Sequence, residues 1–217
     1  MPSTVGQIFE AADLEPSGVV PWGVTPPLPS DSTIPRTGIY VVSLSESLDS
    51  ERPVYSRAPI SKEATSTLLA VRPELTVDDR RPTPTELVDR LKSFWIPDEV
   101  VLYIGLAGKR KSSPRKGEVA KRVGEYYATR LGARSPHAGG WPIKLLACLP
   151  DVFVHFAYCD NEVAAEFSCL RRFREKVSER SLSTLRDRDR AMPFANLEFP
   201  RGQAKAHGIK GAKARRS

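Results

Sequence analysis

The chain has 217 residues, of which 40% are hydrophobic and 27% are charged, a composition typical of a globular protein with one α/β domain and an insertion or tail. The longest apolar run, about eight residues, is too short to span a membrane, and no basic region followed by an apolar stretch opens the chain. We therefore expect neither a membrane protein nor a secreted one. Three cysteines, none at CxxC spacing, argue against a disulfide framework and favour a reducing, cytoplasmic location.

Charge is spread unevenly along the chain. The net charge is +7, but residues 101–217 carry 24 Lys or Arg and 11 Asp or Glu, a net +13, whereas residues 1–100 have a net charge of −6. A basic half of this kind attracts polyanions and speeds their encounter with the protein. The alternative is an ordinary soluble basic surface.

The first half of the chain contains one predicted strand and one helical segment. Residues 1–36 are rich in Pro, Ser and Gly and predict an extended arm after a short amphipathic start. Residues 38–44 are β-branched and aromatic and predict a strand. The segment 45–97 is interpreted as a helical insert, with a short helix through Val71 and a second helix that begins at the capping box Thr83–Glu86.

The second half alternates strands and helices. Residues 100–106 predict a second strand and 118–131 a helix. Residues 143–149 are compatible with either helix or strand. Alternation over 151–159 predicts a third strand, and helical spacing over 162–177 predicts a helix.

These elements, three strands with helices between them, predict an α/β domain that carries a helical insert at about 45–97. The tail, 201–217, has six Lys or Arg and no acidic residue, so it is expected to be flexible until it meets a partner.

Two tyrosines are placed to face the same way. Tyr40 shares a strand face with Val42, and Tyr103 shares one with Val101 and Gly105. If the two strands pair, both phenols can project from one side of the sheet. A glycine on that face would leave room for a ligand to approach the backbone.

Two charged residues fall on the apolar sides of their helices. Arg122 does so in the helix 118–131, and Glu166 does so in the helix 162–177. Arg and Glu rarely turn inward without a partner or a function. Alternatively, both border the core with their stems buried and their charged ends in water.

Two triplets carry a family resemblance. Gly38-Ile39-Tyr40 and Tyr103-Ile104-Gly105 resemble the signature of the GIY-YIG nucleases, and the resemblance extends over about 37–200. Further positions are similar to the family pattern in the same order, namely Arg122 with Tyr126 four residues later, Glu166 in a helix, and Asn196 in Pro193-Phe194-Ala195-Asn196. The chain departs from the family in spacing, since 63 residues separate Tyr40 from Tyr103 and 30 separate Glu166 from Asn196. A long loop adds little closure entropy, so the insert can emerge from the hairpin tip.

The resemblance implies one α/β domain over 37–200, a small three-stranded and mainly antiparallel sheet flanked by helices, with the helical insert in the first hairpin. It also implies a metal-dependent DNA endonuclease. Glu166 would bind Mg²⁺ or Mn²⁺, and Arg122 would hold the phosphate. Tyr40 or Tyr103 would take a proton from the attacking water, with the two left as alternatives. Tyr126 and Asn196 would complete the catalytic site.

A basic loop follows the second triplet and would contact DNA phosphates. Its residues are Lys109, Arg110, Lys111, Arg115 and Lys116. His137, in a glycine-rich loop, is a candidate phosphate contact or acid. The alternatives are a solvated run of charge and a structural loop with an exposed histidine.

Other functions stay open on the sequence alone. The chain could be a nucleic-acid-binding protein without catalysis, or a nuclease directed to RNA, to junctions or to repair structures. It could also be an interaction protein whose insert and tail recruit partners.

Overall fold

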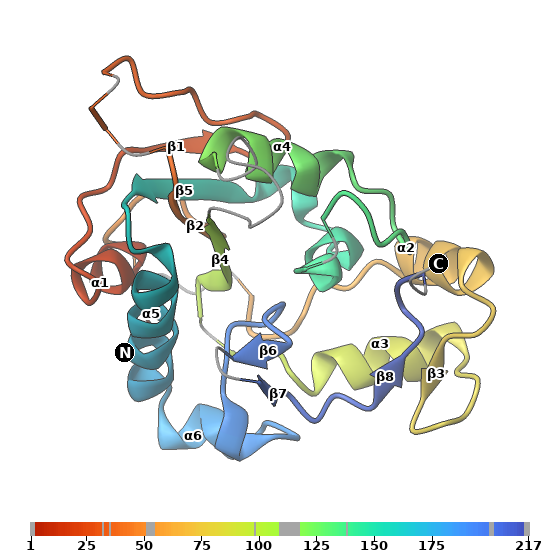
Figure 1. Ribbon diagram of the computed structural model, residues 1–217. Coiled ribbons are helices and arrows are strands. Elements are labelled where there is room, and N and C mark those ends of the chain that lie inside the picture. Colours follow the sequence, from red (N-terminus) through yellow and green to blue (C-terminus); the bar gives the residue numbers. More distant parts are fainter. Residues whose placement is uncertain are drawn as a thin grey trace.

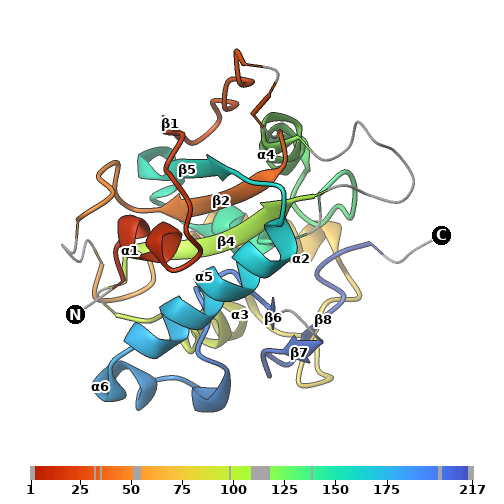
Figure 2. The same ribbon diagram turned by 60° about the vertical axis from the view of Figure 1, so that its left-hand side comes forward.

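A four-stranded antiparallel sheet forms the centre of the molecule (Figures 1 and 2). The computed structural model describes residues 3–31, 33–34, 36–50, 55–97, 99–108, 118–137, 139–199 and 202–214. The strand order is β1–β5–β2–β4, with β1 at Gly18–Pro21, β2 at Gly38–Ser43, β4 at Val101–Ala107 and β5 at Phe153–Tyr158. The predicted α/β fold with a mainly antiparallel sheet is confirmed, and the prediction of three strands is wrong.

The extra strand comes from the N-terminal arm. Strand β1 pairs with β5, with Val19 opposite His155, and it ends at Pro21. Proline lacks the N–H that a central strand would need, so it is tolerated on an edge strand. The proline-rich composition of this arm predicted no strand, and β1 was therefore not identified from the sequence.

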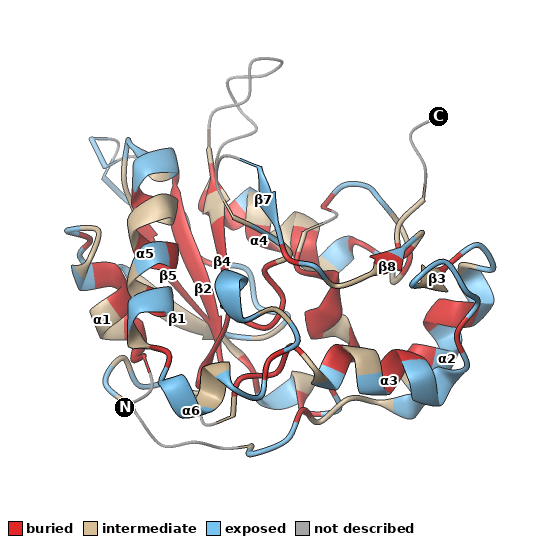
Figure 3. Ribbon diagram, turned by 90° about the horizontal axis from the view of Figure 1, so that it is seen from below, coloured by how far each residue is buried: buried red, intermediate tan, exposed pale blue. Residues whose placement is uncertain are grey.

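Helices cover both faces of the sheet (Figure 3). On one face α1 (Val5–Glu10) and α5 (Glu162–Lys176) bury their apolar sides against Ile39, Val41 and Ile104. On the other face lie α4 (Val119–Ala128) and the 3₁₀ helix η1 (Trp141–Leu145), followed by η2 (Leu149–Asp151). The short elements α6 (Glu179–Leu182) and η3 (Arg188–Arg190) follow α5. Among the described residues, no helix is both long and apolar enough to cross a bilayer.

The predicted insert lies between the paired strands β2 and β4 and contains α2 (Lys62–Val71), β3 (Thr76–Val77) and α3 (Pro84–Lys92). The capping box is confirmed, because the Thr83 hydroxyl accepts from the Glu86 N–H while the Glu86 carboxylate accepts from the Thr83 N–H. Apolar residues of both helices join the core cluster on the tyrosine side of the sheet. The insert is therefore packed onto the domain.

The register of β2 against β4 places both phenols on one face, as predicted. Tyr40 lies opposite Gly105 and Val42 lies opposite Tyr103. A bulge after Val42 shifts the register, and Val101 packs into the core cluster on the opposite face. The prediction that Val101 shares the face of Tyr103 is therefore wrong.

Gly105 makes room for the two phenols. A Cβ atom at this position would lie 2.6 Å from the Tyr40 hydroxyl and 2.7 Å from Cε1 of Tyr103. The aromatic rings occupy the space that was expected to admit a ligand. The absence of a side chain at this position thus allows the two rings to meet, with centroids 5.9 Å apart.

We expect Gly105→Ala to lower the free energy of unfolding by about 1–3 kcal/mol, because the added methyl overpacks the contact between the rings. Gly124→Ala in α4 is the matched control. There the nearest atom to the new Cβ would be Thr25 Oγ1 at 3.6 Å, and a better helix former should stabilise by up to about 1 kcal/mol. Urea unfolding measures both. If Gly105→Ala were as stable as the wild type, the two rings could separate to admit the methyl group at little cost in free energy.

The C-terminal segment folds back onto the domain. Residues 202–214 contain β7 (Gln203–Ala204), which pairs with β6 (Glu198–Phe199), and β8 (Ile209–Lys210), which pairs with β3. The Lys205 side chain is buried and its ammonium donates to the carbonyls of Pro193 and Phe194. The expectation of a flexible tail does not hold for these residues. Their own composition provides no core, but they pair with β3 and β6 and are anchored through Lys205 on the rest of the domain.

Burial lowers the pKa of Lys205 to about 7, against a usual value near 10.4 in an unfolded chain. Between these two pH values Lys205 binds more protons in the unfolded chain than in the folded one, so its contribution to the stability should rise with pH from about 7 to about 10, by at most about 1.4 kcal/mol per pH unit. Lys205→Met should remove this contribution and flatten the pH profile, while Lys210→Met, at an exposed lysine, should keep it. Urea unfolding at pH 7 and at higher pH compares the three proteins. If the free energy of unfolding changed with pH in the same way in the wild type and in Lys205→Met, the lowered pKa of Lys205 would be contradicted.

Candidate active site

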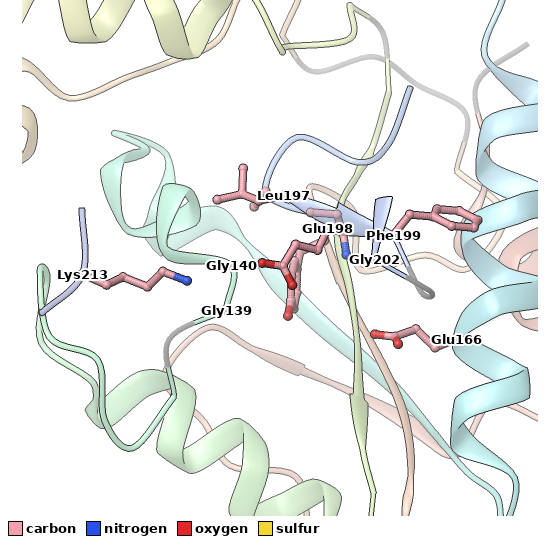
Figure 4. A pocket seen from close by; sticks show the side chains of 11 residues that line it. Gly139, Gly140, Glu166, Leu197, Glu198, Phe199, Gly202 and Lys213 are labelled. Atoms are coloured by element: carbon pink, nitrogen blue, oxygen red, sulfur yellow. The ribbon is translucent and has the colours of Figure 1, made fainter. Parts of the chain in front are cut away.

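A cavity of about 420 Å³ lies at the free edge of β4 (Figure 4). Helix α5 forms one side, Gly139 and Gly140 another, and residues 195–199 with the C-terminal segment the remainder. Its polar side chains come from segments far apart in the chain, namely Tyr103, Glu166, Asn196, Glu198 and Lys213. Three of the sequence-predicted catalytic residues thus meet in one cavity.

Glu166 projects into this cavity from near the N-terminal end of α5, which packs against β4 (Figure 4). Burial raises the pKa of its carboxyl group to about 7, and the positive charge of Arg122 lowers it. Among the described residues, no Lys or Arg nitrogen lies within the 4.0 Å of an ion pair with it. A half-buried carboxylate without an ion pair is available to bind a cation.

The two tyrosines differ in their access to the cavity. Tyr103 lines it, whereas Tyr40 is 1% exposed and lies behind. Burial, followed by the negative charge of Glu166, raises the pKa of Tyr103 to about 12, while a hydrogen bond with Tyr40 and the charge of Arg122 lower it. Burial also raises the pKa of Tyr40 well above its usual value. Only Tyr103 is therefore positioned to touch a molecule in the cavity.

A chain of hydrogen bonds runs from Tyr103 into the protein. The Gly139 N–H donates to Nδ1 of His137 at 3.1 Å, so a neutral imidazole carries its proton on Nε2. Nε2–H then donates to the Tyr40 oxygen at 2.8 Å, which leaves the Tyr40 hydroxyl to donate to Tyr103. In this order of donors, the Tyr103 oxygen accepts a hydrogen bond from the Tyr40 hydroxyl, which His137 orients in turn.

His137 and Tyr126 hold this arrangement from behind. Their rings are stacked with centroids 4.7 Å apart, and the Tyr126 hydroxyl donates to the Gly140 carbonyl. His137 is 2% exposed, so a contact with a DNA phosphate, as predicted, is not available to its ring. The buried tyrosine cluster that encloses it could not be inferred from the glycine-rich loop alone. Both residues position the loop 139–140, and neither lines the cavity.

Arg122 lies close to the site without lining the cavity. Its guanidinium pairs with Glu125 at 3.3 Å, and its charge lowers the pKa of Tyr40, Tyr103 and Glu166. The helix spacing predicted that Arg122 turns inward, and the action of its charge on these three groups agrees with that prediction. To reach a phosphate in the cavity, the guanidinium would have to exchange its partner Glu125.

Asn196 closes the free edge of β4. Its amide oxygen accepts from the Ile104 N–H at 2.8 Å, and its amide nitrogen donates to the Ile104 carbonyl at 2.7 Å. These are the two bonds that a neighbouring strand would make, so the side chain replaces a strand partner at the middle residue of the second triplet. Asn196 consequently fixes the segment 195–199 as a wall of the cavity.

Asn196→Ala should lower the free energy of unfolding by on the order of 3 kcal/mol, because two buried main-chain groups lose their partners. Asn161→Ala is the control, since Asn161 is exposed and its side chain makes no capping bond; its effect should be about 0.5 kcal/mol or less. Chemical denaturation measures both. If the two variants are equally stable, the amide of Asn196 is not what holds the edge.

The donor atoms in the cavity suit a hard cation. The described residues contain no cluster of three or more His, Cys, Asp or Glu that could hold a metal ion by itself. Mg²⁺ is often bound by only one or two carboxylates, with waters and substrate phosphates as the other ligands. Glu166 and Glu198, together with the Tyr103 oxygen, provide an all-oxygen set of that kind.

Two charged residues of the cavity were not identified from the sequence, Glu198 and Lys213. Lys213 belongs to the segment interpreted as a flexible tail. The signal that was available is the pattern around β8, where Ile209 lies between two turn-forming glycines, Gly208 and Gly211. The predicted basic loop, with Lys109, Arg110, Lys111, Arg115 and Lys116, lies outside the described residues.

Comparison of the chain with protein-family models, with curated proteins and with solved structures finds no match in any of the three. The arguments for function therefore come from the residues and geometry of this chain.

Proposed function

We propose that this protein is a metal-dependent endonuclease that hydrolyses phosphodiester bonds in DNA. The observation that carries the proposal is the cavity that joins the Glu166 carboxylate to the Tyr103 phenol, with the Arg122 charge acting on both. The two family-like triplets and the basic second half of the chain add to it. A pKa raised by burial in a cavity is typical of functional residues.

In this proposal Glu166 holds Mg²⁺ or Mn²⁺ in the cavity that Glu198 also lines. The cation would polarise the phosphate and stabilise the leaving oxygen. The GIY-YIG resemblance assigns this role to Glu166, and the half-buried carboxylate without an ion pair supports it.

Tyr103 is the proposed proton acceptor for the attacking water. It reaches the cavity, whereas Tyr40 is behind it. A phenolate at Tyr103 would accept the hydrogen bond from the Tyr40 hydroxyl, which is itself oriented by His137. Since the Glu166 charge is one cause of the raised pKa of Tyr103, neutralising that charge would bring the pKa down toward the working range of a base.

Arg122 would bind the phosphate and offset the charge that builds up on it in the transition state. Its present partner Glu125 is one turn further along α4, so a change of side-chain conformation could transfer the guanidinium to the substrate. The same ion pair also fits a second candidate function, a DNA-binding protein that does not cleave, because a paired Arg122 contributes little to catalysis.

We expect wild-type protein to cleave plasmid DNA with Mg²⁺ or Mn²⁺ and to lose this activity with EDTA. Glu166→Gln and Arg122→Gln should each reduce the rate by on the order of 10²–10³-fold, because the first removes the charge that holds the cation and the second removes a positive charge that offsets the charge on the phosphate. The controls are Glu175→Gln and Arg171→Gln, an exposed ion pair on α5, which should leave the rate within about twofold. Gel electrophoresis of the plasmid forms gives the rates.

Binding of labelled duplex, measured in parallel, separates the two candidate functions. Binding without cleavage under any divalent cation would exclude hydrolysis and leave the DNA-binding function. Unchanged cleavage in Glu166→Gln would place the metal site elsewhere. Comparison of random duplex with branched DNA and RNA tests for structure-specific or RNA-directed cleavage.

A further inference from the structure

Lys213 reaches the cavity from the side opposite to Glu166 (Figure 4). Glu166 comes from α5 and Lys213 from the C-terminal segment, with Glu198 between the two side chains in this view (Figure 4). The cavity thus has acidic side chains on one part of its wall and a cationic one on another. A cavity with negative charge on one part of its wall and positive charge on another can hold a cation and an anion at the same time.

The main chain around Lys213 is anchored on both sides. The Arg72 guanidinium donates to the carbonyls of Gly211 and Lys213, each at 3.2 Å, and the Ala214 N–H donates to the Gly132 carbonyl at 3.1 Å. Gly211 has φ of 72°, and a Cβ there would lie 2.7 Å from the Glu74 carbonyl oxygen. The position of Lys213 is therefore set by the fold and does not depend on its own side chain.

The Lys213 ammonium has no ion-pair partner within 4.0 Å among the described residues. The charged groups that act on it are Glu198, which favours its protonated form, and Arg134, which opposes it. Burial disfavours the protonated form most strongly and lowers the pKa of the amine. An anion in the cavity would compensate this cost, because it would add negative charge to that of Glu198, with which Lys213 forms no ion pair.

We propose that Lys213 binds a non-bridging oxygen of the substrate phosphodiester, so that the phosphate lies between Lys213 and Glu166. The inference rests on the proposed function and extends it, since it makes the C-terminal segment part of the substrate site. A lysine suits this task because its ammonium is a compact charge with three donors that adapt to a phosphate oxygen.

The test is binding of a fluorescein-labelled DNA duplex with Ca²⁺, followed by fluorescence anisotropy over a series of NaCl concentrations. Lys213→Gln should weaken binding about tenfold or more, as expected for loss of a charge-assisted hydrogen bond, and should reduce the salt slope by about one. Lys210→Gln removes the same charge three residues away, at a side chain paired with Asp79, and should stay within about twofold. Lys213→Arg should restore most of the affinity, and thermal melting checks that each variant is folded.

Cleavage by the same proteins separates this inference from the proposed function. A wild type that cleaves, with Lys213→Gln and Lys210→Gln equally weakened in binding, would overturn the role of Lys213 and leave the nuclease proposal standing. A wild type that binds without cleaving, with a specific loss in Lys213→Gln, would support Lys213 as a phosphate contact and exclude hydrolysis. Absence of binding by the wild type would overturn both.

Discussion

The packing of two phenols against one glycine determines how the site is built. Tyr40 and Tyr103 come from neighbouring strands and meet over Gly105, where any side chain would collide with both rings. Because β4 is the outer strand, Tyr103 then lies at the edge of the sheet while Tyr40 is enclosed behind it. One contact therefore places two similar residues differently, since Tyr103 lines the cavity and Tyr40 is enclosed behind it.

The free edge of β4 provides the place where distant segments converge. Edge strands present unpaired main-chain groups that must be satisfied. Here Asn196 satisfies those of Ile104, and in doing so it brings Glu198 beside the cavity. Lys205 continues this anchoring through the carbonyls of Pro193 and Phe194, so the chain that follows can return to the cavity at Lys213. The wall of the site is thus a consequence of how the sheet edge is covered.

Local patterns in the sequence were sufficient for the elements and for several orientations. Alternation along two strands predicted that Tyr40 and Tyr103 share a face, and helical spacing predicted that Arg122 and Glu166 turn inward. Features that depend on long-range contacts were not accessible. The β-bulge that places Val101 on the opposite face depends on the pairing of β2 with β4, which the insert separates in the chain, and β1 forms by pairing with the edge of β5. Burial of His137 likewise depends on a cluster assembled from three segments.

The electrostatics of the cavity give a physical reason to regard it as a binding site. Burying a carboxylate without a partner costs free energy, and the raised pKa of Glu166 expresses that cost. Lys213, on the opposite wall, is disfavoured in its charged form for the same reason. The two charges face one cavity, yet no ion pair joins them at 4.0 Å or less. In the proposed function, a cation would neutralise the Glu166 carboxylate and a phosphate would neutralise the Lys213 ammonium, so the binding of both ligands would offset both costs.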